Sequence, residues 1–124
     1  MIVSKKDTSI LKLDRSLLEV YIIAMKTKLS GTTLKLYESR VIIIKAMAHP
    51  TRLFILDQLK DGPLCVCEIN EMIDADISTI SKHLLLMKNA GLVSSTKNGL
   101  QVYYKLEMPC LLSSFACIDK NQKS

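Results

Sequence analysis

The feature that most constrains the fold is a hairpin signal directly after an amphipathic helix. Over residues 77–90, four apolar side chains repeat at helical spacing and form one stripe: Ile77, Ile80, Leu84 and Met87. Two short β-type runs follow at 93–96 and 101–106. Asn98-Gly99 between them is the strongest short-range signal for a tight hairpin. A helix that leads at once into a hairpin limits the chain to a few small folds.

Three helices are predicted upstream, at 35–47, from Pro50 to about Lys60, and at 65–73. Proline suits the first position of a helix, so Pro50 marks a helix start. A polar turn at 74–76 separates the helix at 65–73 from the helix that carries the stripe. Helix, turn, helix and hairpin is the order of a winged helix-turn-helix, whose second helix lies in the major groove of DNA. The expected class is therefore α+β and mostly α.

Further helices are predicted at both ends of the chain. Ser16 and Glu19 form a capping-box pattern at the start of a helix over 16–29, which stops at Gly31. One apolar stripe runs along it: Leu18, Ile22, Met25 and Leu29. Pro109 begins a last helix, with four apolar residues: Leu111, Leu112, Phe115 and Ile118. A domain of this size cannot cover both helices, so we expect them to be dimerisation helices.

These elements predict an N-terminal extension at 1–33, a winged helix-turn-helix domain at 34–120 and a polar tail at 121–124. No apolar run approaches the roughly 20 residues of a membrane span. The polar start of the chain does not match a signal peptide. We therefore expect a cytoplasmic protein that does not bind membranes and whose four cysteines are reduced thiols.

The formal net charge of +5 is unevenly distributed along the chain. Residues 77–106 contain four basic side chains and no acidic one: Lys82, Lys88, Lys97 and Lys105. Residues 64–76 contain four acidic side chains and no basic one: Glu68, Glu71, Asp74 and Asp76. A basic segment next to an acidic one indicates a phosphate-facing surface more strongly than net charge alone.

The face of the 77–90 helix opposite its apolar stripe carries five polar side chains: Ser78, Thr79, Ser81, Lys82 and His83. Hydroxyls can bond to base edges or phosphates, and Lys82 can neutralise a phosphate. The free N–H groups at the start of a helix also favour anions. A solvated polar face of a small helical protein gives the same pattern, so DNA contact remains one of two interpretations.

Cys65 and Cys67 form a Cys-x-Cys at the start of the helix at 65–73. In a regular helix, residues two apart point about 200° apart, so both sulfurs can share an ion only at an irregular N-terminus. That location lowers the pKa of a thiol, and two thiolates select soft, thiophilic ions. Two buried structural thiols are the alternative.

Four stretches in this order resemble the ArsR/SmtB family of metalloregulatory repressors: KAMAHPTRLFILDQL (45–59), PLCVCEI (63–69), ISTISKHLLLMKNAGLV (77–93) and NGLQVYYKL (98–106). The resemblance covers roughly residues 36–118. It implies a homodimeric repressor, not an enzyme, that releases double-stranded operator DNA of two-fold symmetry when a metal or metalloid binds. It places the polar face from Ser78 to His83 on the recognition helix and residues 97–103 in the wing, with Lys97 and Gln101 contacting DNA.

The string LCVCE (64–68) resembles the arsenic-binding box of the family's arsenite sensors. This implies arsenite or antimonite, As(III) or Sb(III), as inducer, bound by Cys65 and Cys67 without a permanent cofactor. Asn70 stands where those sensors commonly have a third cysteine, so Cys110 or Cys117 is the candidate third ligand.

Two further regions depart from the family pattern. Asn98, Gly99, Leu100 and Gln101 replace the arginines common at the wing turn, and residues 1–33 have no identified counterpart. The last helix has no histidine and a single acidic residue, Asp119, which does not match the zinc sensors.

Three other functions remain open. The same repressor could respond to cadmium, lead, copper(I) or thiol oxidation. A thiol oxidoreductase could use Cys65 and Cys67, although the chain has no Cys-x-x-Cys and no parallel-sheet pattern. An interaction protein with inert thiols is the third. Metal titration followed by thiol absorbance separates them.

Overall fold

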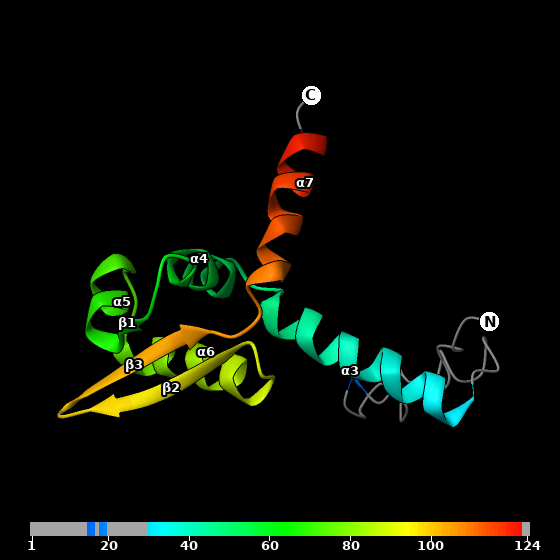
Figure 1. Ribbon diagram of the computed structural model, residues 1–124, viewed down its shortest axis with the longest axis horizontal. Coiled ribbons are helices and arrows are strands. Elements are labelled where there is room, and N and C mark those ends of the chain that lie inside the picture. Colours follow the sequence, from blue (N-terminus) through cyan, green and yellow to red (C-terminus); the bar gives the residue numbers. More distant parts are fainter. Residues whose placement is uncertain (1–14, 17, 20–29, 123–124) are drawn as a thin grey trace, which may run out of the picture. The chain divides into compact units, whose positions relative to one another are not determined.

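The computed structural model describes residues 15–16, 18–19 and 30–122 (Figure 1). The chain divides into two compact units, residues 1–41 and 42–124. Of the helix predicted over 16–29, residues 16, 18 and 19 are helical. Its other residues, including Ile22, Met25 and Leu29, lie outside the described part. The domain boundaries inferred from the sequence stay a prediction.

Helix α3 spans Gly31–Met47 and begins four residues before the predicted start. Ser30 precedes it, and Ser30 Oγ accepts a hydrogen bond from the N–H of Thr33 at 3.3 Å. Serine favours this capping position. Gly31 is the first residue of α3, and the end of the helix predicted over 16–29 lies outside the described residues. Ala46 is buried, whereas Leu36 is 49% exposed.

Helices α4, Pro50–Leu59, and α5, Val66–Met72, lie close to their predicted ranges. Pro50 occupies the first turn of α4 as expected, and His49 is the N-cap. Helix α4 buries three side chains: Ile55, Leu56 and Leu59. These pack with Ile69 of α5 in the same hydrophobic core.

Helix α6, Ile77–Asn89, contributes the centre of that core. Ile80, Leu84 and Met87 have no exposed surface, as their spacing predicted. Ile77 is 59% exposed, so its predicted burial is wrong; it is the first helical residue, where the stripe extends past the core. Asp76 is the N-cap residue but its side chain makes no capping hydrogen bond. Gly91 follows the helix with a φ of +83°, a left-handed conformation that glycine favours just past the end of a helix.

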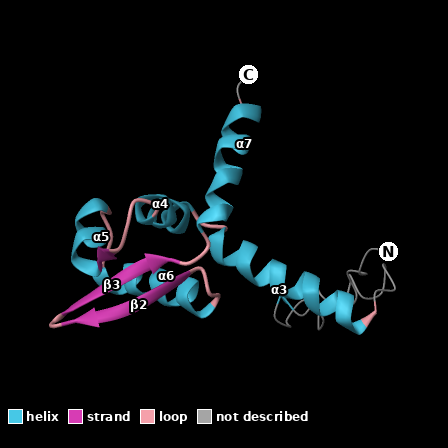
Figure 2. Cartoon of the chain, in the orientation of Figure 1, coloured by secondary structure: helices cyan, strands magenta, loops and turns pink. Residues whose placement is uncertain are grey.

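The sheet has three antiparallel strands in the order β1-β3-β2 (Figure 2). Strands β2, Val93–Asn98, and β3, Gln101–Leu106, form the predicted hairpin. Asn98 pairs with Gln101, so the turn centres on Gly99-Leu100 rather than on Asn98-Gly99. Gly99 has a φ of +64°, which suits the first central position of a type II′ turn. The winged helix-turn-helix class is thereby confirmed.

The third strand, β1, Leu64–Cys65, has no counterpart in the sequence predictions. It pairs with β3, with Leu64 opposite Tyr104 and Cys65 opposite Tyr103. The start of α5 is therefore attached to the hairpin through the backbone of Cys65.

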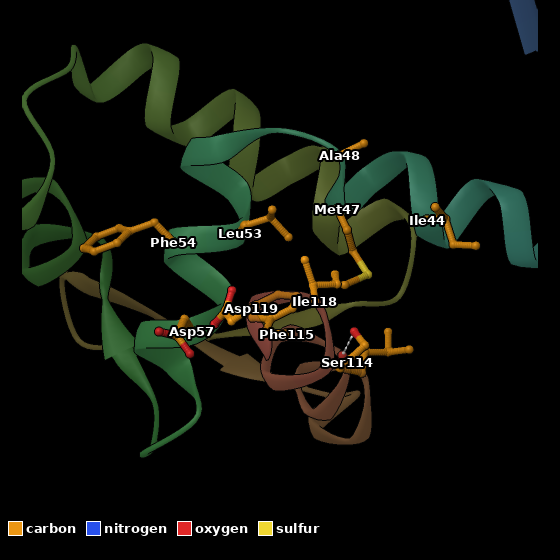
Figure 3. A pocket seen from close by; sticks show the side chains of 11 residues that line it. Ile44, Met47, Ala48, Leu53, Phe54, Asp57, Ser114, Phe115, Ile118 and Asp119 are labelled. Carbon is orange, nitrogen blue, oxygen red and sulfur yellow. Dashed lines mark hydrogen bonds between the residues drawn. The ribbon is translucent and has the colours of Figure 1, made fainter. Parts of the chain in front are cut away.

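The predicted last helix consists of a 3₁₀ turn, η1, Pro109–Leu112, followed by helix α7, Ser113–Asn121. An open hollow of about 560 Å³ lies between α7, the end of α3, and α4 (Figure 3). Its lining is mostly apolar and includes Ile44, Met47, Leu53, Phe115 and Ile118. Ile118 is 51% exposed, so α7 presents an apolar face that the described chain leaves open. Within the described ranges, no helix combines the length and apolarity that a membrane crossing requires.

Candidate nucleic-acid interface and thiol site

One side of α6 is buried in the core, and the opposite side is polar and exposed. Because Ile80, Leu84 and Met87 are buried, the remaining positions of the helix, His83 excepted, face outwards. Ser78, Thr79, Ser81 and Lys82 are all exposed and lie in the first half of α6. Their hydroxyls, one ammonium and the free N–H groups of the first turn can together bind phosphates and base edges.

His83 differs from the other four residues predicted for this face. It is half-buried, and its ring stacks at a tilt on that of His49, with centroids 4.5 Å apart. Arg52 Nη1 lies 3.4 Å from His83 Nδ1. Burial, then the neighbouring His49 and Arg52, lowers the pKa of His83 below its ordinary value. His83 is therefore less exposed than the other four residues, because its ring contacts the segment at the start of α4. Its predicted contact with DNA stays a prediction.

The hairpin presents Lys97 and Gln101 at its exposed end. Lys97 pairs with Val102, and Gln101 pairs with Asn98 at the turn. Leu100 at the tip is 97% exposed. The hairpin end therefore offers one cation, two amides and an apolar tip, with fewer charges than an arginine-rich wing would carry.

The two sulfurs of the Cys-x-Cys come together at the N-terminus of α5. Cys65 is the N-cap, with an extended backbone (φ −77°, ψ 157°), and this irregular geometry brings its sulfur to that of Cys67. The two Sγ atoms are joined in a disulfide, so the expectation of free thiols is wrong here for this pair. Cys65 is buried and Cys67 is exposed.

A reciprocal capping box holds Cys65 in place. Cys65 Sγ accepts a hydrogen bond from the N–H of Glu68 at 3.3 Å, and the N–H of Cys65 donates to Glu68 Oε2 at 3.2 Å. This arrangement satisfies two donors at the helix start that would otherwise lack partners. The sulfur of Cys65 is thus part of the structure that starts α5.

Cys110 and Cys117 are free and exposed, on η1 and α7. Asn121 Nδ2 lies 3.9 Å from Cys117 Sγ. In the described part of the chain, no three histidine, cysteine or acidic side chains are grouped closely enough to hold a metal ion. The described chain therefore brings together the two predicted sulfur ligands, Cys65 and Cys67, and leaves both candidates for the third ligand apart from them.

Known proteins match the part of the chain that contains α4, α5 and α6. The family model described as bacterial regulatory protein, arsR family, matches residues 49–95. The arsenical resistance operon repressor of Staphylococcus xylosus is 32% identical over 99 residues, which cover 71% of this chain and 95% of that protein. The chain belongs to the ArsR family.

Two further comparisons agree with membership of the ArsR family. The cadmium resistance regulatory protein CadC homolog of Staphylococcus aureus is 39% identical over 66 residues, or 52% of this chain. The match spans about half of that relative, 54% of its length. The solved homodimeric winged helix-turn-helix DNA-binding domain of Mb0332 from Mycobacterium bovis superposes with a TM-score of 0.68 at 26% identity, covering 76% of this chain and 90% of that one.

Two features of this ArsR-family regulator were not predicted from the sequence. His49 and Arg52 meet His83 from more than thirty positions away, and β1 connects the thiol pair to the hairpin. A helix start at Pro50 does indicate that position 49 is a cap. No local pattern, however, identifies its contact with position 83.

Proposed function

We propose that this ArsR-family regulator is a homodimeric cytoplasmic repressor of transcription, and not an enzyme. It binds double-stranded operator DNA of two-fold symmetry and releases it when arsenite or antimonite binds Cys65 and Cys67. The observation that carries the proposal is the double attachment of Cys65. Its backbone pairs with Tyr103 of the hairpin, and it caps α5, which contacts α6. A ligand on this sulfur therefore acts on both elements proposed to face DNA.

The DNA contact is supported by the polar face of α6 and by the exposed Lys97 and Gln101 of the hairpin. All charged side chains between 77 and 106 are lysines. Four lysines in this segment favour phosphate binding with a strong dependence on salt. On this proposal Ser78 and Thr79 read sequence, and Lys82 contributes affinity on any sequence.

Lys82→Ala should weaken DNA binding on all duplexes and reduce the slope of log affinity against log salt by about one unit. The measurement is fluorescence anisotropy with a labelled duplex over a series of salt concentrations. Lys120→Ala is the matched control, because Lys120 is an exposed lysine of α7 and the change in net charge is the same. If Lys82→Ala and the parent gave equal DNA-binding curves at every salt concentration, α6 would not be part of the DNA interface.

Dimerisation is supported by the open apolar hollow beside α7. A second copy of the chain would cover Phe115 and Ile118 together with the end of α3. A charge introduced there should oppose association, because it would have to be desolvated in the interface.

Ile118→Lys should therefore shift the dimer towards monomer at micromolar concentration, by at least about tenfold in dissociation constant. Sedimentation equilibrium gives the constant directly. Leu100→Lys is the control, since Leu100 is equally apolar but lies at the hairpin tip. A parent protein that sediments as a monomer would refute the dimer itself.

The arsenite site requires the reduced form of the thiol pair. Each thiol displaces one hydroxyl of arsenous acid as water, so two As–S bonds form without any change of oxidation state. The disulfide between Cys65 and Cys67 must first accept two electrons from a cellular dithiol or from two monothiols. The third position on arsenic would be filled by Cys110 or Cys117 of a second subunit, or by a solvent hydroxyl.

The disulfide itself supports a second candidate, in which thiol oxidation is the input. A peroxide or a disulfide oxidant would remove two electrons from the Cys65–Cys67 pair and take up its two protons. Operator binding by the reduced and oxidised forms, compared without arsenite, separates the candidates. Equal affinity of the two forms favours a metalloid input, and different affinity favours a redox input. Cadmium, named for one relative, remains a further thiophilic ligand to titrate.

A further inference from the structure

Three basic side chains form a cluster between the start of α4 and α6, the helix proposed to contact DNA. His49 and His83 are the two histidines of the chain, and they are in contact with each other. Arg52 lies beside His83, and its Nη2 donates to the carbonyl oxygen of Lys45 near the end of α3 at 3.4 Å. The end of α3, the start of α4 and the middle of α6 thus meet at one guanidinium group.

The contacts of the cluster give Nδ1 of each ring the role of a hydrogen-bond acceptor. The N–H of Thr51 donates to His49 Nδ1 at 3.1 Å, so this nitrogen is an acceptor and carries no proton. A guanidinium group has donors only, so His83 Nδ1 beside Arg52 Nη1 is also an acceptor. In this arrangement the Nδ1 atoms of both rings therefore accept hydrogen bonds from their neighbours.

Protonation of either ring removes an acceptor that the fold uses. At His49 it breaks the side-chain cap of α4, and at His83 it places a cation against Arg52. Two protonated rings would bring three positive charges into one partly buried contact. The electrostatic repulsion would act directly on the contact between α4 and α6.

We propose that His49, Arg52 and His83 form a proton-sensitive link that holds α6 in its DNA-binding position while both rings are neutral, so that acidification releases DNA. The release step rests on the proposed DNA-binding function. The link itself is a property of the folded chain alone. On this proposal His83 is a positioning residue rather than a reader of bases.

Among the described residues, no opposing charge contacts His83. His49 and Arg52 reach it from the α4 side, and Lys82 precedes it on α6. The acidic side chains of α5, Glu68 and Glu71, form no ion pair with it in this part of the chain, and β2 adds no charged contact to the ring. A proton on His83 is therefore opposed by its neighbours, in agreement with the lowered pKa of this group.

The lowered pKa determines the direction of the pH dependence. The unfolded chain takes up a proton at about 6.5, and the folded chain only at a lower pH. Between these values the unfolded state binds more protons, so stability is complete above about 6.5 and decreases as pH falls. The same sign applies to any open form in which α6 has moved away from Arg52.

Affinity of the reduced wild-type dimer should decrease at least about fivefold between about pH 7.5 and about pH 5.5. The probe is a labelled duplex that the wild-type protein selects from a random-sequence pool. His49→Asn and His83→Asn, alone and together, are the test variants, because the Asn oxygen replaces Nδ1 as an acceptor and does not titrate. The double variant should hold affinity within about twofold over this range.

The sign of the effect separates this link from ordinary phosphate attraction. Protonation that merely added positive charge would strengthen DNA binding at low pH. Wild-type affinity that is constant or increases on acidification would overturn the inference, as would an equal decrease in the double variant. A protein that binds no selected duplex at any pH contradicts the proposed function instead.

NMR titration of the two histidine Cε1–H signals tests the link without DNA. With its ring half-buried in the contact, His83 should titrate below the ordinary histidine pKa of about 6.5, and Arg52→Met should raise its pKa. A His83 signal that titrates at 6.5 or above in the folded wild-type protein overturns the link, whatever the DNA measurement gives.

Discussion

Cys65→Ser and Cys67→Ser should each retain operator binding and lose release by arsenite. A hydroxyl does not replace a soft thiolate as a ligand for As(III), so each variant leaves a single sulfur at the site. Folding should persist because serine is a preferred N-cap, and its hydroxyl can accept the hydrogen bond from the Glu68 N–H that Cys65 Sγ accepts now. The measurement is operator occupancy against arsenite concentration under constant reductant, with the half-release concentration rising more than about a hundredfold.

Cys110→Ser and Cys117→Ser provide the internal comparison, because both residues are exposed and neither shares the α5 terminus. A true third ligand should behave like Cys65, whereas a thiol that is not a ligand should leave the response unchanged. If neither substitution changes the response to arsenite, the site has two sulfur ligands and a solvent hydroxyl as its third ligand. If Cys65→Ser and Cys67→Ser respond like the parent, the pair is structural and the arsenite proposal is wrong, although DNA binding is untouched.

Leu84→Ala should lower the free energy of unfolding by about 2–5 kcal/mol, the range for leucines truncated in a close-packed core. Leu84 has no exposed surface and packs at the centre of the core formed by α4, α5, α6 and the sheet. Urea unfolding at one fixed protein concentration measures the change, since association contributes to the stability of a dimer.

Leu85→Ala is a matched control one residue along the same helix. Leu85 is 53% exposed, so the same truncation should change stability by less than about 0.5 kcal/mol. Equal losses for the two variants would mean that Leu85 is covered in the assembled protein, and would identify a second interface on α6.

The local elements followed from the sequence because their signals act over a few residues. Pro50 starts α4, and the periodic Ile80, Leu84 and Met87 are buried, as predicted. The predicted ends of two elements were wrong. Capping by Ser30 starts α3 before its predicted first residue, and the hairpin turn lies one position after the predicted one, on Gly99-Leu100. At such points two neighbouring residues offer similar local stabilisation, and packing selects between them.

The amino-acid sequence by itself determined the order of helices and hairpin, the outward polar face of α6 and the adjacency of two thiols. Only the tertiary structure decided that Cys65 pairs with Tyr103, that its sulfur meets that of Cys67, and that His83 faces His49 and Arg52. Spacing along the chain reports which face of an element is apolar. It does not report which distant backbone will pair with a two-residue strand, or which side chains will meet once the core closes, because those contacts form between segments that share no local pattern.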